Sequence, residues 1–121
     1  VPDERARVAA VFINRLRQGM RLQSDPTIAY GLGPEKGTFS GRLLFRHLET
    51  DHPYNTYTRM GLPPGPIANP GVDSIVAALN PAESKDLYFV ADGTGGHAFA
   101  TTLAEHNENV AKWRRIRRNS R

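Results

Sequence analysis

The chain has 121 residues, of which 39% are hydrophobic and 23% charged, and it contains no cysteine. This length favours one domain, and the composition is ordinary for a globular protein. The lack of cysteine excludes disulfides, thiol catalysis and a zinc finger, and no apolar run approaches the roughly 18 residues of a membrane span.

Charge is concentrated at the C-terminus. The formal net charge is +4, yet residues 112–121 carry six positive charges and no negative one, which leaves −2 for residues 1–111. A nucleic-acid-binding function would therefore depend on this basic tail alone. A solvated helix end is the simpler interpretation, and Trp113 sits at a core-type helical position rather than one suited to base stacking.

The first predicted helix covers residues 3–18, because apolar residues from Val8 to Leu16 recur at helical spacing. Acidic side chains in its first turn suit the helix dipole, and Gly19 is expected to end it. Residues 20–24 are predicted to form a short strand.

A second, short helix is predicted to follow. Asp25 is expected to be its cap and Pro26 its first helical residue. The helix is expected to reach Tyr30 and to be ended by Gly31 and Gly33.

The middle of the chain is largely irregular. Within residues 34–53, leucines at 43, 44 and 48 predict one or two helical turns. Residues 53–71 contain five prolines, which remove backbone donors and fix φ, so no regular structure is expected there.

Regular structure is predicted again after Gly71. Residues 72–79 are expected to be a helix, and residues 87–90 and 97–100 two strands joined by a turn. Thr102 and Glu105 form a capping-box pattern, T-x-x-E, that opens a last helix.

These elements predict an α+β fold. A small antiparallel hairpin would be accompanied by N-terminal, mid-chain and C-terminal helices and a long Pro/Gly-rich loop, in a single domain of residues 1–121 that ends in the basic tail of residues 112–121.

The sequence offers little conventional catalytic machinery. The four histidines show no metal-ligand spacing, so neither a metal nor a cofactor is expected, although His97 and His106 could line one edge of a cleft. There is no nucleophile elbow, P-loop or dinucleotide fingerprint. No carboxylate lies in an apolar run that would raise its pKa into the range of a general acid.

The most unusual stretch is YNTYTRMGLPPGPIANPG, residues 54–71. Its tyrosines offer faces for sugar rings, and its asparagines and backbone groups can pair with hydroxyls and acetamides. Prolines pre-set the shape, which lowers the ordering cost of binding. A polysaccharide groove fits these residues well. A peptide-recognition loop or a merely stiff connection remains an alternative.

Four segments together resemble one known family. They are VFINRLRQGMRLQSDPTIAYGLG (11–33), HPYNTYTRMGLPPGPIANPG (52–71), LNPAESKDLYFVADGTGGHAF (79–99) and TTLAEHNENV (101–110). In this order they resemble the catalytic region of the YceG-like endolytic murein transglycosylases. The resemblance covers nearly the whole chain.

The resemblance implies cleavage of peptidoglycan glycan strands without water. One glutamic acid protonates the glycosidic oxygen, and the 6-hydroxyl of N-acetylmuramic acid closes onto C1 to give a 1,6-anhydro end. This differs from hydrolases that use two carboxylates. The resemblance also implies a parent anchored by an N-terminal segment outside this chain, acting on the extracytoplasmic face of the bacterial cytoplasmic membrane near cell-wall synthesis proteins.

The family's catalytic glutamate lies in an E-x-E-T-like segment before the helix that carries VFINRL. That segment is expected upstream of Val1, and Glu4 matches a later acidic residue of the family. No catalytic residue is therefore assigned within the chain, which by itself is expected to be inactive.

The resemblance instead implies a glycan-binding groove. Gln23 and Asp25 match the L-Q-S-D-P motif, Asn55 is a candidate acetamide partner and Tyr57 a candidate ring platform. An Asn55→Ala change is expected to lower activity without unfolding, whereas melting would make the residue structural. The full set of expected substrate-binding residues is Gln23, Asp25, Asn55, Thr56, Tyr57, Gly61, Leu62, Pro63, Pro64, Asn69, His97 and Phe99.

Two alternatives to this enzyme part remain open at the level of sequence. The first is a non-catalytic module that holds peptidoglycan or proteins of the cell-wall synthesis machinery. The second is a nucleic-acid binder that acts through residues 112–121, which the resemblance disfavours.

Overall fold

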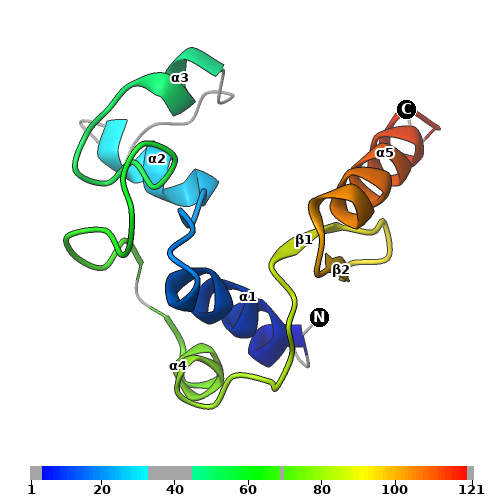
Figure 1. The fold of residues 1–121 in the computed structure, drawn as a ribbon, viewed down its shortest axis with the longest axis horizontal. Helices are drawn as coiled ribbons and strands as arrows, with labels where there is room; N and C mark the ends of the chain where they lie inside the picture. The colour runs from blue at the N-terminus through cyan, green and yellow to red at the C-terminus, as the bar shows by residue number, and fades with distance from the viewer. Residues whose placement is uncertain (1–3, 33–44, 69, 120–121) are drawn as a thin grey trace. The chain divides into compact units, whose positions relative to one another are not determined.

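The computed structural model describes residues 4–32, 45–68 and 70–119 (Figure 1). The chain divides into two compact units. One is formed by residues 1–14 with residues 70–121, and the other by residues 15–69.

The first unit holds a hairpin and most of the helices. Its elements are α1 (Arg5–Arg17, up to residue 14), α4 (Val72–Leu79), β1 (Tyr88–Ala91), β2 (His97–Ala100) and α5 (Leu103–Asn119). Helices together with an antiparallel pair of strands confirm the predicted α+β class.

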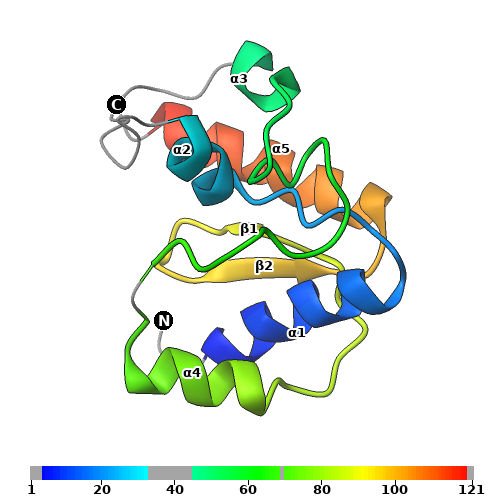
Figure 2. The same cartoon turned by 90° about the vertical axis from the view of Figure 1, so that its left-hand side faces the viewer.

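The hairpin lies between α1 and α5 (Figure 2). The two strands pair antiparallel with Phe89 opposite Phe99. Since side chains alternate between the two faces of a strand, these phenylalanines share one face and Tyr88 lies on the other. Phe89 meets Phe12 of α1 edge to face at 5.8 Å between ring centroids, while Tyr88 stacks on His106 of α5 at 5.0 Å.

Helix α5 begins at the predicted cap, with one difference. The Thr102 hydroxyl accepts the N–H of Glu105 at 3.2 Å, as in a capping box. The Glu105 carboxylate, however, accepts the N–H of Thr101 at 3.2 Å, one residue before the one expected. This first turn satisfies donors that would otherwise be left without partners.

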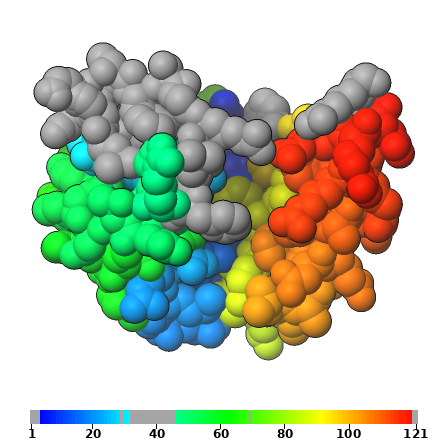
Figure 3. Space-filling view, turned by 90° about the horizontal axis from the view of Figure 1, so that it is seen from above, coloured from blue at the N-terminus to red at the C-terminus, as the bar shows by residue number. Residues whose placement is uncertain are grey.

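The basic segment belongs to α5 as far as Asn119, and the outer surface of this helix is visible in orange and red in Figure 3. Its cationic side chains are exposed, and none forms an ion pair with another residue in the described ranges; they are Lys112, Arg114, Arg115, Arg117 and Arg118.

Helix α4 has the predicted bounds, but much of its apolar stripe faces solvent. Val72 and Leu79 are each 75% exposed and Val76 is 50% exposed, whereas Ala77 is buried at 8%. The helix therefore packs through its small residue and leaves larger apolar side chains uncovered within the described structure.

The second unit contains the end of α1, α2 (Asp25–Leu32) and α3 (Phe45–Glu49). Helix α1 ends as predicted at Gly19, whose φ is +71°. The N–H of Gly19 bonds to the carbonyl of Leu16 at 3.3 Å and that of Met20 to the carbonyl of Arg15 at 2.9 Å. This pair of bonds is a Schellman motif.

Two sequence predictions in this unit are wrong. Residues 20–24 do not form a strand, because Gln23 has φ +50° and its N–H bonds to the carbonyl of Thr56 at 3.2 Å. Helix α2 does not end at Gly31 but runs through it to Leu32. A side chain at Gly31 would collide with the ring of His52. The glycine therefore allows α2 to lie close to the segment that carries His52. Gly33 lies outside the described residues.

No helix in the described ranges is both long and apolar enough to cross a bilayer.

Candidate functional site

Asn55 is the centre of a buried polar network in the second unit. It is 0% exposed. Its Nδ2 donates to the carbonyls of Leu48 at 3.0 Å and Thr50 at 2.8 Å. Its Oδ1 accepts the backbone N–H groups of Tyr57 at 2.7 Å and Thr58 at 3.2 Å. These bonds use both amide protons and the oxygen of Asn55. The buried side chain thereby connects residues 48 and 50 to residues 57 and 58 and fixes the conformation of the loop. Its predicted contact with an acetamide remains a prediction.

Thr56 joins the same loop to the start of α2. Its hydroxyl oxygen accepts the N–H of Ser24 at 2.8 Å and lies 2.9 Å from the hydroxyl of Thr27. Thr56 is only 2% exposed. The YNTY motif and the LQSDPT motif, 32 residues apart, therefore form one hydrogen-bonded unit.

Tyr57 and Asp25 form the exposed polar edge of this network. The Tyr57 hydroxyl donates to Oδ1 of Asp25 at 2.6 Å. Partial burial of the phenol, followed by this hydrogen bond, raises the pKa of Tyr57 above its ordinary value. Two residues predicted to contact sugar thus lie together, with one tyrosine ring beside one carboxylate.

The raised pKa of Tyr57 predicts a loss of stability in alkali. The folded state holds the phenolic proton more tightly than the unfolded state, whose tyrosine has a pKa of about 10. The contribution of Tyr57 to the free energy of unfolding should therefore be fully present below that pH and be lost as the pH rises above it. In chemical denaturation at increasing pH, Tyr57→Phe should show a smaller alkaline loss than the wild type. Equal losses in both proteins would contradict the assignment.

An exposed ion pair, between Asp51 and Arg59, lies in the same loop. Asp51 accepts two hydrogen bonds from Arg59, at 3.0 and 3.1 Å, and one from the hydroxyl of Thr58 at 2.7 Å. The bonds from Arg59 and then Thr58 lower the pKa of Asp51 to about 2. This pair was not predicted from the sequence. Its bidentate Arg–carboxylate geometry is one of the stronger forms of hydrogen-bonded ion pair.

The remainder of the predicted groove wall varies in exposure. Gly61 has φ +78°, which favours glycine at this turn. Leu62 is 73% exposed, Pro63 is half-buried and Pro64 is exposed. Asn69 lies outside the described residues.

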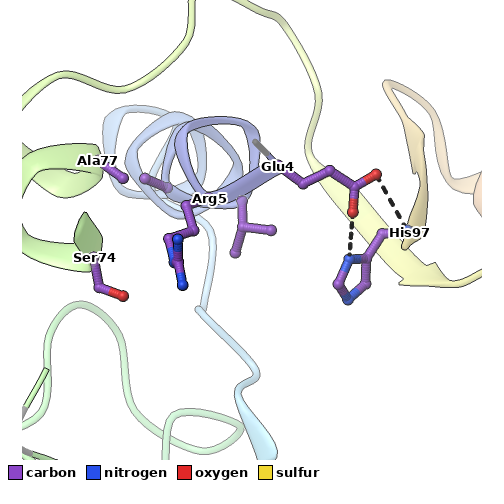
Figure 4. A pocket seen from close by; sticks show the side chains of 7 residues that line it. Glu4, Arg5, Ser74, Ala77 and His97 are labelled. Atoms are coloured by element: carbon purple, nitrogen blue, oxygen red, sulfur yellow. Dashed lines mark hydrogen bonds and ion pairs between the residues drawn. The ribbon is translucent and has the colours of Figure 1, made fainter. Parts of the chain in front are cut away.

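The first unit carries a separate cavity of about 440 Å³, shown in Figure 4. On one side, Glu4 just before α1 meets His97 of β2. One oxygen of Glu4 lies 3.0 Å from Nδ1 of His97, and the other accepts the backbone N–H of His97 at 3.3 Å. The hydrogen bond from the His97 side chain is the main cause that lowers the pKa of Glu4.

The rest of the cavity combines apolar and polar groups. Val8 and Ala9 of α1 and Ala77 of α4 supply its apolar wall, while Arg5 and Ser74 supply polar groups. Its size is within the range of small-ligand pockets. Sequence reasoning missed the Glu4–His97 pair because 93 residues separate its members, and only the packing of α1 on the hairpin brings them together.

The two other predictions for the hairpin have different outcomes. Phe99 lies beneath Arg7, whose guanidinium carbon is 4.0 Å from the ring centroid, so its face is covered by a cation. His97 and His106 do not line one edge. His97 lies on the strand face that meets α1, whereas His106 stacks on Tyr88 on the opposite face.

Within the described ranges there is no cluster of three or more His, Cys, Asp or Glu side chains arranged to hold a metal ion.

The structure defines an α+β chain with a polar loop in one unit and, in the other, a cavity that pairs a carboxylate with an imidazole. The model of the YceG-like family matches residues 1–112. The chain belongs to the YceG-like family, as the motifs predicted.

Its relatives are longer proteins. The chain is 47% identical over 110 residues to the endolytic murein transglycosylase of Bacillus subtilis, covering 91% of this chain and 29% of that protein. It is 38% identical over 112 residues to the enzyme of the same name from Streptococcus pneumoniae D39, covering 91% of this chain and 20% of that protein. The chain thus spans less than a third of the curated relatives it matches.

A solved structure has the same fold. The crystal structure of a YceG-like protein from Listeria monocytogenes matches with a TM-score of 0.74 and 48% sequence identity. The match covers 84% of this chain and 31% of that one.

Proposed function

We propose that this chain is the glycan-binding part of an endolytic murein transglycosylase. The observation that carries the proposal is 47% identity to a protein of that name across nearly the whole chain. The substrate would be peptidoglycan glycan strands, cut with formation of 1,6-anhydro-N-acetylmuramic ends.

The polar loop supports a binding role. Tyr57 and Asp25 present a ring face and an acceptor for sugar hydroxyls, while Gln23 and Leu62 are exposed beside the same segments of chain. Asn55 and Thr56 act from within by holding the loop in shape. Such preorganisation reduces the ordering cost that binding would otherwise incur.

We place the general acid outside these 121 residues. A general acid must hold its proton near working pH, which requires a raised carboxyl pKa. The pKa values of Glu4, Asp51 and Asp92 are instead lowered, by His97, by Arg59 and by Thr94 respectively. These carboxyl groups therefore suit a role as anions.

The proposed substrate also implies a location. Murein lies outside the cytoplasmic membrane, so the protein would act there, held by an anchor outside this chain and close to cell-wall synthesis proteins.

The test compares two proteins on purified glycan strands. One is the 121-residue chain, and the other is a version extended upstream through the expected glutamate. Mass spectrometry should find 1,6-anhydro-muramic ends only with the extended version. Product from the short chain would place the acid within it. Product from neither folded protein would overturn the enzymatic proposal and favour a binding module.

A further inference from the structure

Four cations in the C-terminal half of α5 share one side of the helix, which is named the cationic face here: Lys112, Arg114, Arg115 and Arg118. An α-helix turns by about 100° per residue, so these positions cover about 160° of its circumference, with Ala111 near the centre. All of these residues are exposed. The face is therefore open to a partner over about two helical turns.

The other side of α5 packs against the hairpin. His106 stacks on Tyr88 of β1 at 5.0 Å between ring centroids. Nearer the C-terminal end of the helix, Trp113 and Ile116 lie beside Gly93 in the hairpin turn. These contacts fix the rotation of the helix about its own axis, so the cationic face is turned away from the hairpin.

The charge of the cationic face is not neutralised within the protein. In the described ranges no acidic residue forms an ion pair with any of its four members. The carboxylate of Glu105, which lies earlier in α5, accepts the backbone N–H of Thr101. Like charges four residues apart, such as Arg114 and Arg118, repel each other and destabilise a helix. A bound anion would relieve this repulsion.

The same face contains a hollow of about 360 Å³. Ala111, which has a short side chain, lines it together with Arg114, Arg115 and Arg118, and Arg117 lines its edge. A guanidinium group forms paired hydrogen bonds with two oxygens of one phosphate. The volume is within the range that small polar ligands occupy. The hollow therefore fits the phosphate-bearing headgroup of a lipid.

We propose that the cationic face of α5 docks on a surface of anionic phospholipid headgroups. The arginines pair with the lipid phosphates, and Lys112 adds to the attraction as a point charge. The four members of the face include no large apolar side chain, so the contact is electrostatic and does not insert into the acyl region. Docking holds the first unit beside the membrane surface.

Two observations favour a membrane over a nucleic acid or another phosphate polymer. Binding of single strands uses aromatic stacking, and Trp113 lies on the packed side of the helix. A face that covers about 160° of the helix suits a planar array of headgroups, whereas one polymer strand would contact only a narrow track of it. The presence of a membrane nearby rests on the proposed function, which places the protein outside the cytoplasm.

The helix dipole explains only part of this charge. Arg117 and Arg118 lie in the last turn of α5, where cations complement the partial negative charge of the helix C-terminus. The effect falls off beyond the last turn. It therefore does not account for Lys112, Arg114 and Arg115.

The experiment sediments the 121-residue chain with vesicles of phosphatidylcholine alone and with vesicles that also contain about 30% phosphatidylglycerol. The wild type should bind only the anionic vesicles. The triple variant Arg114→Gln, Arg115→Gln and Arg118→Gln should bind them about 100-fold more weakly, at about fivefold per charge removed. Glutamine preserves helix propensity, and circular dichroism checks the helix content of each variant.

The matched control removes three exposed arginines of the second unit, as Arg17→Gln, Arg21→Gln and Arg46→Gln. It has the same net charge as the first variant and should bind within about threefold of the wild type, because charges away from the contact are screened. Equal losses in the two variants would show that net charge alone causes binding and would refute the assignment to α5. Wild-type binding should also fall steeply between about 0.1 M and about 0.5 M salt.

Three further probes decide the kind of partner: a DNA strand of about 20 nucleotides, a soluble glycerol phosphate polymer at the same phosphate concentration, and purified murein. If the wild type binds any of these more tightly than the anionic vesicles, or does not bind the vesicles at all, the lipid assignment is wrong. Vesicle binding requires no glycan cleavage. If the test for anhydro ends fails while binding to anionic vesicles through α5 is observed, the proposed function falls and the docking surface stands.

Discussion

Asn55→Ala should lower the free energy of unfolding of the second unit by about 3 kcal/mol or more. The substitution removes four hydrogen bonds from a fully buried side chain. It leaves the N–H of Tyr57 without its acceptor and two carbonyls without this donor, whereas the N–H of Thr58 keeps a 3.3 Å bond to the backbone carbonyl of residue 55. Unsatisfied buried polar groups account for most of the expected loss.

Asn80→Ala is the matched control for this prediction. Asn80 is exposed, and its amide makes one 3.3 Å bond to the carbonyl of Val76 at the end of α4. Its loss should cost less than about 1 kcal/mol. Urea denaturation followed by circular dichroism measures both variants. If Asn55→Ala melts like the wild type and loses only glycan binding, Asn55 contacts the sugar as the sequence suggested, and its structural role is secondary.

Gly31→Ala should destabilise the same unit by about 2 kcal/mol, although alanine is the better helix former by about 1 kcal/mol. A Cβ at this position would overlap the ring of His52. Helix α2 and the segment before the YNTY motif would have to separate to admit it. Native-state hydrogen exchange should then show faster exchange of the amides in α2.

Gly65→Ala is the comparison for Gly31→Ala. Its added Cβ would lie 3.4 Å from the Tyr54 hydroxyl, an ordinary contact, so its effect should stay within about 0.5 kcal/mol. If Gly31→Ala and Gly65→Ala have the same free energy of unfolding, the His52 ring moves aside at little cost. The absence of a side chain at Gly31 would then not be required for stability.

Local chemistry was a good guide to the helices and strands. The bounds of α4 match the prediction, and the two strands lie within one residue of it. Clear start signals support the helices, with Gly71 before α4 and the Thr102 cap before α5. The prediction of a strand at residues 20–24 failed because a positive φ at Gln23, set by bonds to Thr56, overrides local propensity.

The candidate sites were less predictable. The sequence indicated Asp25 and Tyr57 separately, but their 2.6 Å hydrogen bond depends on how the loop returns to α2. It indicated Asn55 as a candidate acetamide partner, whereas the structure buries the side chain completely and pairs its amide within its own loop. Glu4 was assigned a place in the first turn of a helix and a match to an acidic residue of the family, whereas it lies just before α1 and contacts His97. Nothing in its neighbours in sequence indicates this partner.

The amino-acid sequence by itself determined the family, the α+β class, and the order of the helices and of the two hairpin strands, since these follow from short-range patterns of apolar spacing, caps and motifs. The tertiary structure decided which polar groups face solvent, which are enclosed, and which meet across long stretches of chain. The Glu4–His97 pair shows the reason. Its members lie 93 residues apart, and their 3.0 Å contact accompanies the packing of α1 against the hairpin, where Phe12 meets Phe89.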